Sequence, residues 1–146
     1  GERLKNLTGL KYTDTKLHEF QECLTLDEYR FDVVWGCDEM LLGATATGAP
    51  AAIGSTYNVM APLYLRLLDA VSRADFEKAR HLQGCSIRAI RALNDYPFHS
   101  AMKAVLRMQG LDVGGCRLPQ GKLTEAEVAT LRSKLEKIGF FDWDQS

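Results

Sequence analysis

A lysine near the end of a short apolar segment is the residue of this 146-residue chain best suited to covalent chemistry. Lys11 lies between Leu10 and Tyr12, near the C-terminal end of a predicted strand, where parallel α/β folds carry their reactive groups. An unprotonated lysine amine can attack a carbonyl carbon, and burial favours that form because the ammonium ion loses its hydration. The resulting imine accepts the electron pair released when a neighbouring carbon–carbon bond breaks. The alternative interpretation is a surface lysine at a strand end.

Polar residues also follow the next two predicted strands. Gly36, Asp38 and Glu39 come after the second strand, and Ser55 and Thr56 come after the third. The carboxylates could accept hydrogen bonds from the hydroxyls of a sugar-like substrate, and the glycine would allow a close approach of the backbone. Each group also has a simpler interpretation, since acidic residues in a first helical turn offset the helix dipole, and Ser and Thr commonly cap helices.

The elements that must position these residues alternate between strand and helix. Short apolar segments predict strands near residues 7–12, 31–35 and 51–54, and residues 4–6 are interpreted as the end of a helix. Apolar residues recur at helical spacing between the strands, so a parallel sheet is expected. The pattern predicts an α/β fold with three βα units.

Strand signals end near residue 73, and the remainder of the chain predicts helices. Asp75 begins a long helix, a shorter helix follows Pro97, and Thr124 with Glu127 forms a capping box for the last helix. We therefore divide the chain into βα units over residues 1–73 and a C-terminal helical extension over residues 74–146.

Composition restricts the possible partners. Eighteen basic and nineteen acidic residues give a net charge of −1, and no block of five like charges indicates a nucleic-acid or polybasic membrane surface. The polar beginning of the chain predicts no signal peptide, and glycines and prolines interrupt the uncharged run at residues 40–65, so no membrane span is predicted. The four cysteines form no C-x-x-C pair, and we interpret them as reduced thiols of a cytosolic protein.

The order of these motifs resembles the C-terminal part of the N-acetylneuraminate lyase branch of the dihydrodipicolinate synthase superfamily, the (β/α)8 Schiff-base aldolases. The similarity spans nearly the whole chain. It rests on four strings: Gly9-Leu10-Lys11-Tyr12-Thr13, Gly36-Cys37-Asp38-Glu39, Gly54-Ser55-Thr56-Tyr57-Asn58 and Arg117-Leu118-Pro119.

This resemblance implies a partial (β/α)8, or TIM, barrel followed by the helical extension. It implies reversible cleavage of N-acetylneuraminate to N-acetylmannosamine and pyruvate in the cytoplasm, without a metal or organic cofactor, by a homo-oligomer that is commonly a tetramer. Lys11 would be the Schiff-base lysine. The implied substrate contacts are Thr13, Gly36, Asp38, Glu39 and Ser55.

A complete (β/α)8 barrel needs about 250 residues, and only ten residues precede Lys11. We therefore expect the chain to lack the family's first five strands, its Ser/Thr pair that holds the substrate carboxylate, and its proton-relay tyrosine. Tyr12 is a poor substitute for that tyrosine because neighbouring strand residues face opposite ways.

Three strands cannot close a barrel, and open strand edges present unpaired backbone groups. The chain is expected to self-associate, to pair with a complementary fragment, or to form an open three-layer α/β arrangement. The alternatives to an aldolase are a half-barrel assembly module with little catalysis and a module that only binds pyruvate or sugar.

Overall fold

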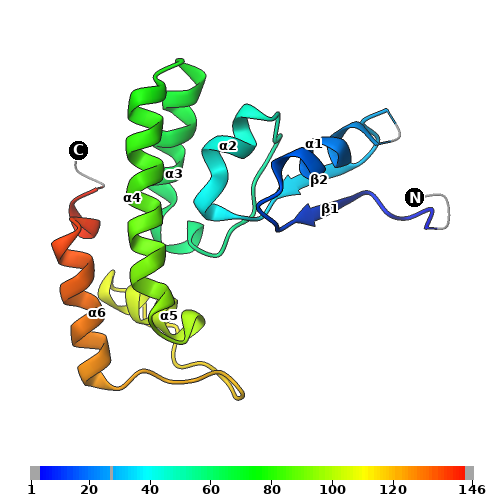
Figure 1. Cartoon of the computed structure of the whole chain (residues 1–146). Coiled ribbons are helices and arrows are strands. Elements are labelled where there is room, and N and C mark those ends of the chain that lie inside the picture. Colours follow the sequence, from blue (N-terminus) through cyan, green and yellow to red (C-terminus); the bar gives the residue numbers. More distant parts are fainter. Residues whose placement is uncertain (1–3, 27, 144–146) are drawn as a thin grey trace.

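The sheet at the N-terminal end of the chain is small and parallel. The structure, a computed structural model, describes residues 4–26 and 28–143. Strand β1 (Gly9–Tyr12) pairs with β2 (Asp32–Trp35), with Lys11 opposite Val34. Helix α1 (Leu17–Thr25) connects the two strands and covers one face of the sheet (Figure 1).

The predicted third strand is reduced to a single parallel bridge between Trp35 and Ala52. The Trp35 N–H donates to the carbonyl of Ala51 at 3.0 Å, and the Ile53 N–H donates to the carbonyl of Trp35 at 2.8 Å. The parallel alignment is as expected, but among the described residues the pairing stays limited to this bridge. The predicted helix end at residues 4–6 is wrong, because these residues form a turn. In this turn the Leu7 N–H donates a hydrogen bond to the carbonyl of Leu4.

An aromatic cluster fixes which face of β1 points to α1. Phe20 and Trp35 are fully buried and pack edge to face with ring centroids 5.0 Å apart, and Tyr12 stacks on Trp35 at 6.0 Å. Full burial of a Phe side chain contributes about 1.5–3 kcal/mol, so this face of the sheet is strongly specified. Since side chains alternate along a strand, Lys11 faces the side that α1 does not cover.

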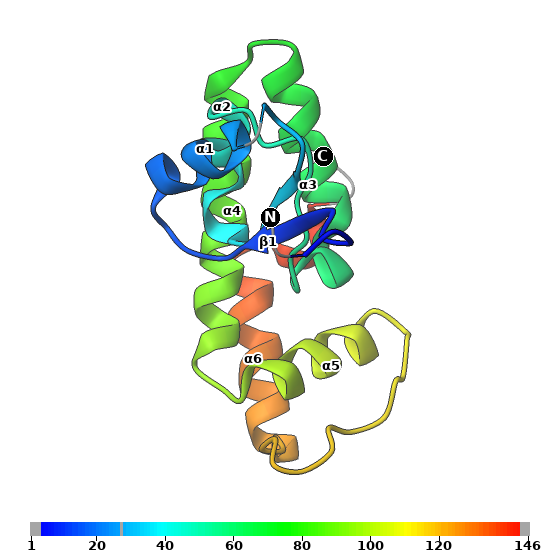
Figure 2. The ribbon, with the colours of Figure 1, turned by 90° about the vertical axis from the view of Figure 1, so that its right-hand side faces the viewer.

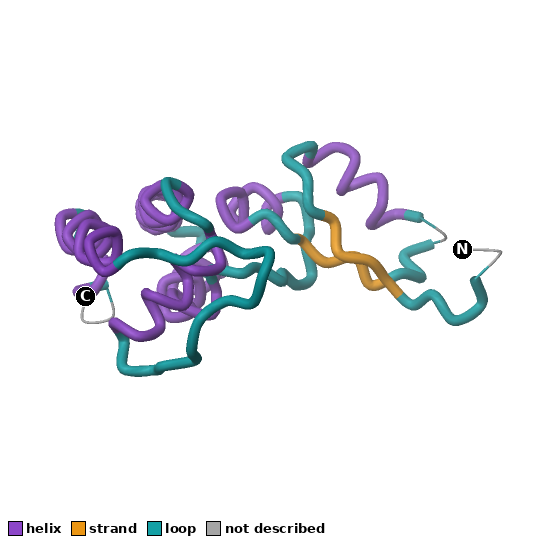
Figure 3. The backbone as a smooth tube through the Cα atoms, turned by 90° about the horizontal axis from the view of Figure 1, so that it is seen from below, coloured by secondary structure: helices purple, strands orange, loops and turns teal. Residues whose placement is uncertain are grey.

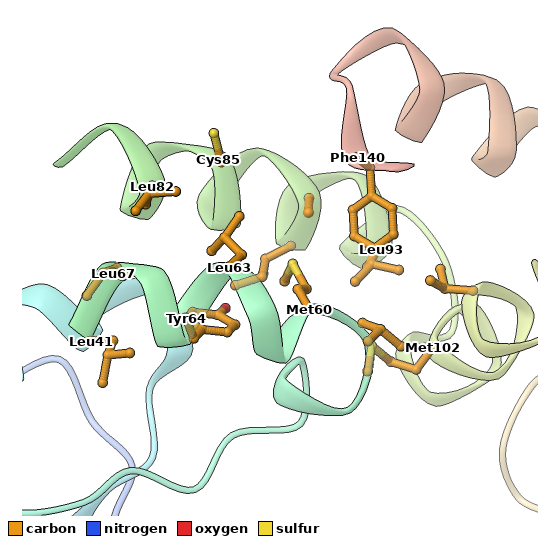
Figure 4. Packing of buried hydrophobic residues seen from close by; sticks show 14 of the residues in the cluster. Leu41, Met60, Leu63, Tyr64, Leu67, Leu82, Cys85, Leu93, Met102 and Phe140 are labelled. Atoms are coloured by element: carbon orange, nitrogen blue, oxygen red, sulfur yellow. The ribbon is translucent and has the colours of Figure 1, made fainter. Parts of the chain in front are cut away.

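Two antiparallel helices form the centre of the molecule. The 3₁₀ turn η1 (Asp38–Met40) and α2 (Leu41–Ala46) follow β2, and α3 (Tyr57–Ser72) then packs along α4 (Phe76–Asn94) (Figures 1 and 2). Figure 4 shows apolar side chains of both helices pointing toward one another. They include Met60, Leu63, Leu67, Leu82 and Leu93.

The remaining elements are helical, as predicted. Helix α5 (Phe98–Met108) is followed by a long connection to α6 (Glu125–Lys137) and to η2 (Phe140–Asp142), with strands and helical extension at opposite ends of the molecule (Figure 3). The predicted capping box is confirmed, because Thr124 Oγ1 accepts from the Glu127 N–H at 3.2 Å and Glu127 Oε2 accepts from the Thr124 N–H at 2.7 Å.

One hydrophobic core crosses the proposed division at residue 73, since it includes side chains of β2, α3, α4 and α6. The two parts therefore differ in secondary structure but pack as one body. Across the described ranges, no helix combines the length and the apolar character that crossing a bilayer requires.

Candidate active site

Lys11 and Thr13 converge on Gly36 at the C-terminal ends of the two strands. A methyl group placed on Gly36 would lie 2.1 Å from Thr13 Oγ1 and 2.5 Å from Lys11 Cε. The Gly36 N–H also donates to the carbonyl of Tyr12 at 2.7 Å, which holds the strand ends together. A side chain at position 36 would therefore force Thr13 or Lys11 to move. The prediction that Gly36 allows a substrate to approach the backbone stays a prediction.

The Lys11 side chain is exposed in this chain. The described residues cover the sheet on the α1 side only, so they do not supply the shielding from water that an amine nucleophile needs. Tyr12 faces the other way, as predicted, and its hydroxyl donates to Glu19 Oε2 at 3.1 Å. Partial burial and the Glu19 carboxylate raise the pKa of Tyr12 above its ordinary value. Tyr12 therefore belongs to the packed face.

Asp38 is buried and anchors the start of α3. Its Oδ2 accepts from the Thr56 N–H at 2.9 Å and from Thr56 Oγ1 at 2.5 Å, and Thr56 Oγ1 lies 2.8 Å from the Tyr64 hydroxyl. Asp38 Oδ1 has no hydrogen-bond partner among the described residues and lies against Gly54. Thr56 does not cap α3 with its own side chain, because the hydroxyl is used by Asp38. Instead, the carboxylate contacts the N-terminus of α3, where negative charge is favourable.

Four of the six predicted site residues line one cavity of about 220 Å³, namely Gly36, Asp38, Glu39 and Ser55. Lys11 and Thr13 adjoin this cavity through Gly36. All six follow or end neighbouring strand segments, whose carboxyl ends meet at one edge of a parallel sheet. The structure thus brings the predicted residues into one region.

Sequence reasoning missed the far wall of the cavity. Ile90 and Asn94 come from the last turns of α4, and Phe98 begins α5. No local motif distinguishes these three residues, because they reach the cavity only through the way α4 packs back on α3.

Protonated groups surround the carboxylates at the cavity. Burial and the neighbouring Glu39 carboxylate raise the pKa of the Cys37 thiol to about 11, and Cys37 Sγ lies 3.5 Å from Glu39 Oε2. Burial and the charge of Asp38 likewise raise the pKa of Tyr57 and of Tyr64. The cavity therefore offers acceptors on Glu39, a hydroxyl on Ser55, and neighbours that stay neutral at pH 7.

Within residues 4–26 and 28–143, no cluster of three or more His, Cys, Asp or Glu side chains is arranged to hold a metal ion. The side chains of this region include an amine, carboxylates and hydroxyls.

Known proteins match nearly the whole chain. A sequence model described as the Dihydrodipicolinate synthetase family matches residues 2–138. N-acetylneuraminate lyase of Pongo abelii is 32% identical over 145 residues, which are 97% of this chain and 45% of that protein. A 4-hydroxy-tetrahydrodipicolinate synthase of Lactobacillus acidophilus is 33% identical over 133 residues, 91% of this chain and 42% of that protein.

The fold agrees with the sequence matches. The solved N-acetylneuraminate lyase of Proteus mirabilis superposes with a TM-score of 0.90 at 34% identity, covering 96% of this chain and 48% of that chain. The chain thus spans slightly less than half the length of these relatives. The predicted resemblance is confirmed, and the chain belongs to the dihydrodipicolinate synthetase family.

Proposed function

We propose that this chain supplies the lysine-bearing part of a Schiff-base lyase that reversibly cleaves N-acetylneuraminate to N-acetylmannosamine and pyruvate. The observation that carries the proposal is the convergence of Lys11 and Thr13 on Gly36, beside a cavity lined by Glu39 and Ser55. The N-acetylneuraminate lyases among the relatives support the choice of sialic acid. A dihydrodipicolinate-type relative also matches, so the polar cavity residues are the main argument for a hydroxylated substrate.

In the proposed reaction, Lys11 Nζ attacks the keto carbon of the substrate, and loss of water gives an imine. A base takes the proton of the hydroxyl on the carbon β to the imine, and the new carbonyl of the sugar aldehyde forms as the bond between the α and β carbons breaks. The electron pair of that bond moves toward the imine nitrogen and leaves an enamine. The enamine is then protonated on carbon, and water releases pyruvate. Tyr12 lies on the face of β1 opposite to Lys11, so we do not assign the base to Tyr12.

Glu39 and Ser55 are the proposed direct contacts to the hydroxylated part of the substrate, and Thr13 is the proposed contact near the imine. The contribution of Asp38 is proposed to be indirect. Its Oδ2 is occupied by Thr56, and its Oδ1 is shielded against Gly54. Asp38 would thereby hold the loop that presents Ser55.

Exposed apolar side chains indicate that a further protein surface covers this chain. Leu10 on β1 is 40% exposed, Ile53 beside the parallel bridge is 56% exposed, and Leu65 on α3 is 66% exposed. We propose that a complementary barrel half or another copy of the chain covers them in a cytoplasmic homo-oligomer. Lys11 lies on the opposite face of β1 from Leu10, so the cover would have to extend over that face as well to shield Lys11 from water.

The same exposure favours a second candidate function, a half-barrel assembly module with little catalysis of its own. Measuring the turnover of N-acetylneuraminate distinguishes the lyase from the assembly module. Turnover should be measured for the chain alone and after addition of the N-terminal half of an N-acetylneuraminate lyase. Turnover that appears only with the added half supports the lyase. No turnover in either sample, with a complex formed between the two, supports the assembly module.

Glu39→Ala tests the contact to the sugar part. The variant should bind N-acetylmannosamine more weakly while still forming a borohydride-reducible adduct with pyruvate, because Glu39 lies away from the amine. If adduct and sugar binding fall together, Glu39 is part of the fold and not of the substrate site.

A further inference from the structure

Gln83 connects the helical extension to the segment that carries the predicted acidic residues. It lies on α4, is 7% exposed, and is 45 positions from Asp38 in the sequence. Gln83 Oε1 accepts from the Leu42 N–H at 2.9 Å, and Gln83 Nε2 donates to the carbonyl of Asp38 at 3.2 Å. A single side-chain amide thus bonds to both η1 and the start of α2.

The η1–α2 segment has backbone groups that need these partners. Neither Cys37 nor Met40, the residues at the N-caps of η1 and α2, makes a side-chain capping hydrogen bond. The first N–H groups of a helix have no intrahelical acceptor, and a buried N–H without one is costly. Gln83 therefore acts as the cap that the local sequence does not provide.

The orientation of the Gln83 amide is itself fixed. Nε2 donates to Ser86 Oγ at 2.8 Å, and Ser86 Oγ donates to the carbonyl of Gln83 at 2.9 Å. Rotation of the amide by half a turn would place its NH₂ group against the Leu42 N–H and its oxygen against the Asp38 carbonyl. The Leu42 N–H and the Asp38 carbonyl thus select the arrangement in which every group is paired, and Ser86 further orients the amide by accepting its second hydrogen.

We infer that Gln83 is a positioning residue for Glu39. The Asp38 carbonyl belongs to the peptide group that joins Asp38 to Glu39. A hydrogen bond to that oxygen therefore restrains the orientation of this peptide plane, and with it the direction of the Glu39 side chain. Glu39 lines the cavity. The inference rests on the proposed function for the identity of the sugar ligand, but the backbone restraint does not depend on it.

Hydrogen–deuterium exchange of the whole chain tests the restraint. In Gln83→Leu, the amides of residues 38–42 should exchange roughly 25-fold faster than in the native chain, since each of the two lost hydrogen bonds to this segment changes local opening by about fivefold. Gln109→Leu is the matched control, because Gln109 also donates its Nε2 to a backbone carbonyl, that of Val59 at 2.9 Å, but lies outside the cavity. Equal exchange of residues 38–42 in both variants would overturn the inference.

Ser86→Ala provides a milder change in case Gln83→Leu fails to fold. It removes only the group that orients the amide, so a smaller acceleration of exchange, confined to the same segment, is expected. Unchanged exchange in a folded Ser86→Ala, with Gln83→Leu unfolded, would also contradict the inference.

Borohydride trapping then tests the consequence for the ligand. Pyruvate and N-acetylneuraminate are supplied separately, and the ratio of the two adducts is compared among the native chain, Gln83→Leu and Gln109→Leu. The ratio should move at least fivefold toward pyruvate in Gln83→Leu only, because the proposed contact of Glu39 is to the sugar part of the substrate. Parallel loss of both adducts would refute the positioning role. If the native chain forms neither adduct even with the added N-terminal half of an N-acetylneuraminate lyase, the proposed function fails, while the exchange result still decides the backbone restraint.

Discussion

Replacing Gly54 with alanine should strongly destabilise the chain through Asp38. The new methyl group would lie 1.6 Å from Asp38 Oδ1 and 2.3 Å from Asp38 Cγ, whereas non-bonded atoms pack at about 3.5 Å. The buried carboxylate must therefore move by about 2 Å, which breaks both of its hydrogen bonds from Thr56. Hydrogen bonds to charged groups contribute about 1.5–3 kcal/mol each, and Gly→Ala regains about 0.4–1 kcal/mol from the unfolded state.

The expected net loss is about 2–5 kcal/mol in the free energy of unfolding, measured by urea denaturation followed by circular dichroism. Gly84→Ala is the control, because the nearest atom to its new methyl group is Arg88 Nη1 at 3.5 Å. Within α4 this control should be stabilising by about 0.5–1 kcal/mol. In an Asp38→Ala background, Gly54→Ala should cost less than about 1 kcal/mol, because the clash is gone. An equal cost in both backgrounds would refute the role assigned to Asp38.

Three further predictions concern other parts of the chain. Gly36→Ala should abolish adduct formation at Lys11 while costing only about 1–3 kcal/mol of stability through overpacking; an unchanged adduct yield would show that the lysine does not act from this position. Thr124→Ala should cost about 1 kcal/mol by thermal unfolding, because it removes the capping box of α6, and a loss below the measurement error would contradict that role. Cys37, with its pKa at about 11, should be alkylated slowly at pH 8, where about one thiol in a thousand is ionised. Glu39→Gln should shift the rise in alkylation rate to lower pH, since it removes a negative charge that favours the protonated thiol, and an unshifted profile would assign the raised pKa to burial alone.

The sequence predicts the features that depend on local patterns. Alternating strand and helix, the Thr124 capping box and the grouping of residues at strand ends all follow from periodicity and from the geometry of parallel sheets. The convergence of Lys11 on Gly36 is of this kind, because it needs only the pairing of β1 with β2.

Other features depend on contacts between distant segments. The sequence alone predicts Asp38 as a surface acid or a substrate contact. In the structure, Thr56, eighteen positions later, donates two hydrogen bonds to Asp38 Oδ2. Gln83, Asn94 and Phe98 reach the cavity region through the packing of α4 against α3, which no short motif encodes. The third strand is reduced to one bridge, and strand propensity alone does not show how far pairing with a neighbouring strand extends.

The most direct measurement is the distribution of pyruvate adducts over the lysines of this chain after borohydride reduction, with the N-terminal half of an N-acetylneuraminate lyase added, read by peptide mass spectrometry. A Schiff-base role predicts an adduct concentrated on Lys11, absent in Lys11→Ala and unaffected in Lys78→Ala, which alters an exposed lysine of α4. Adducts spread evenly over the exposed lysines, or none on Lys11, would contradict the account.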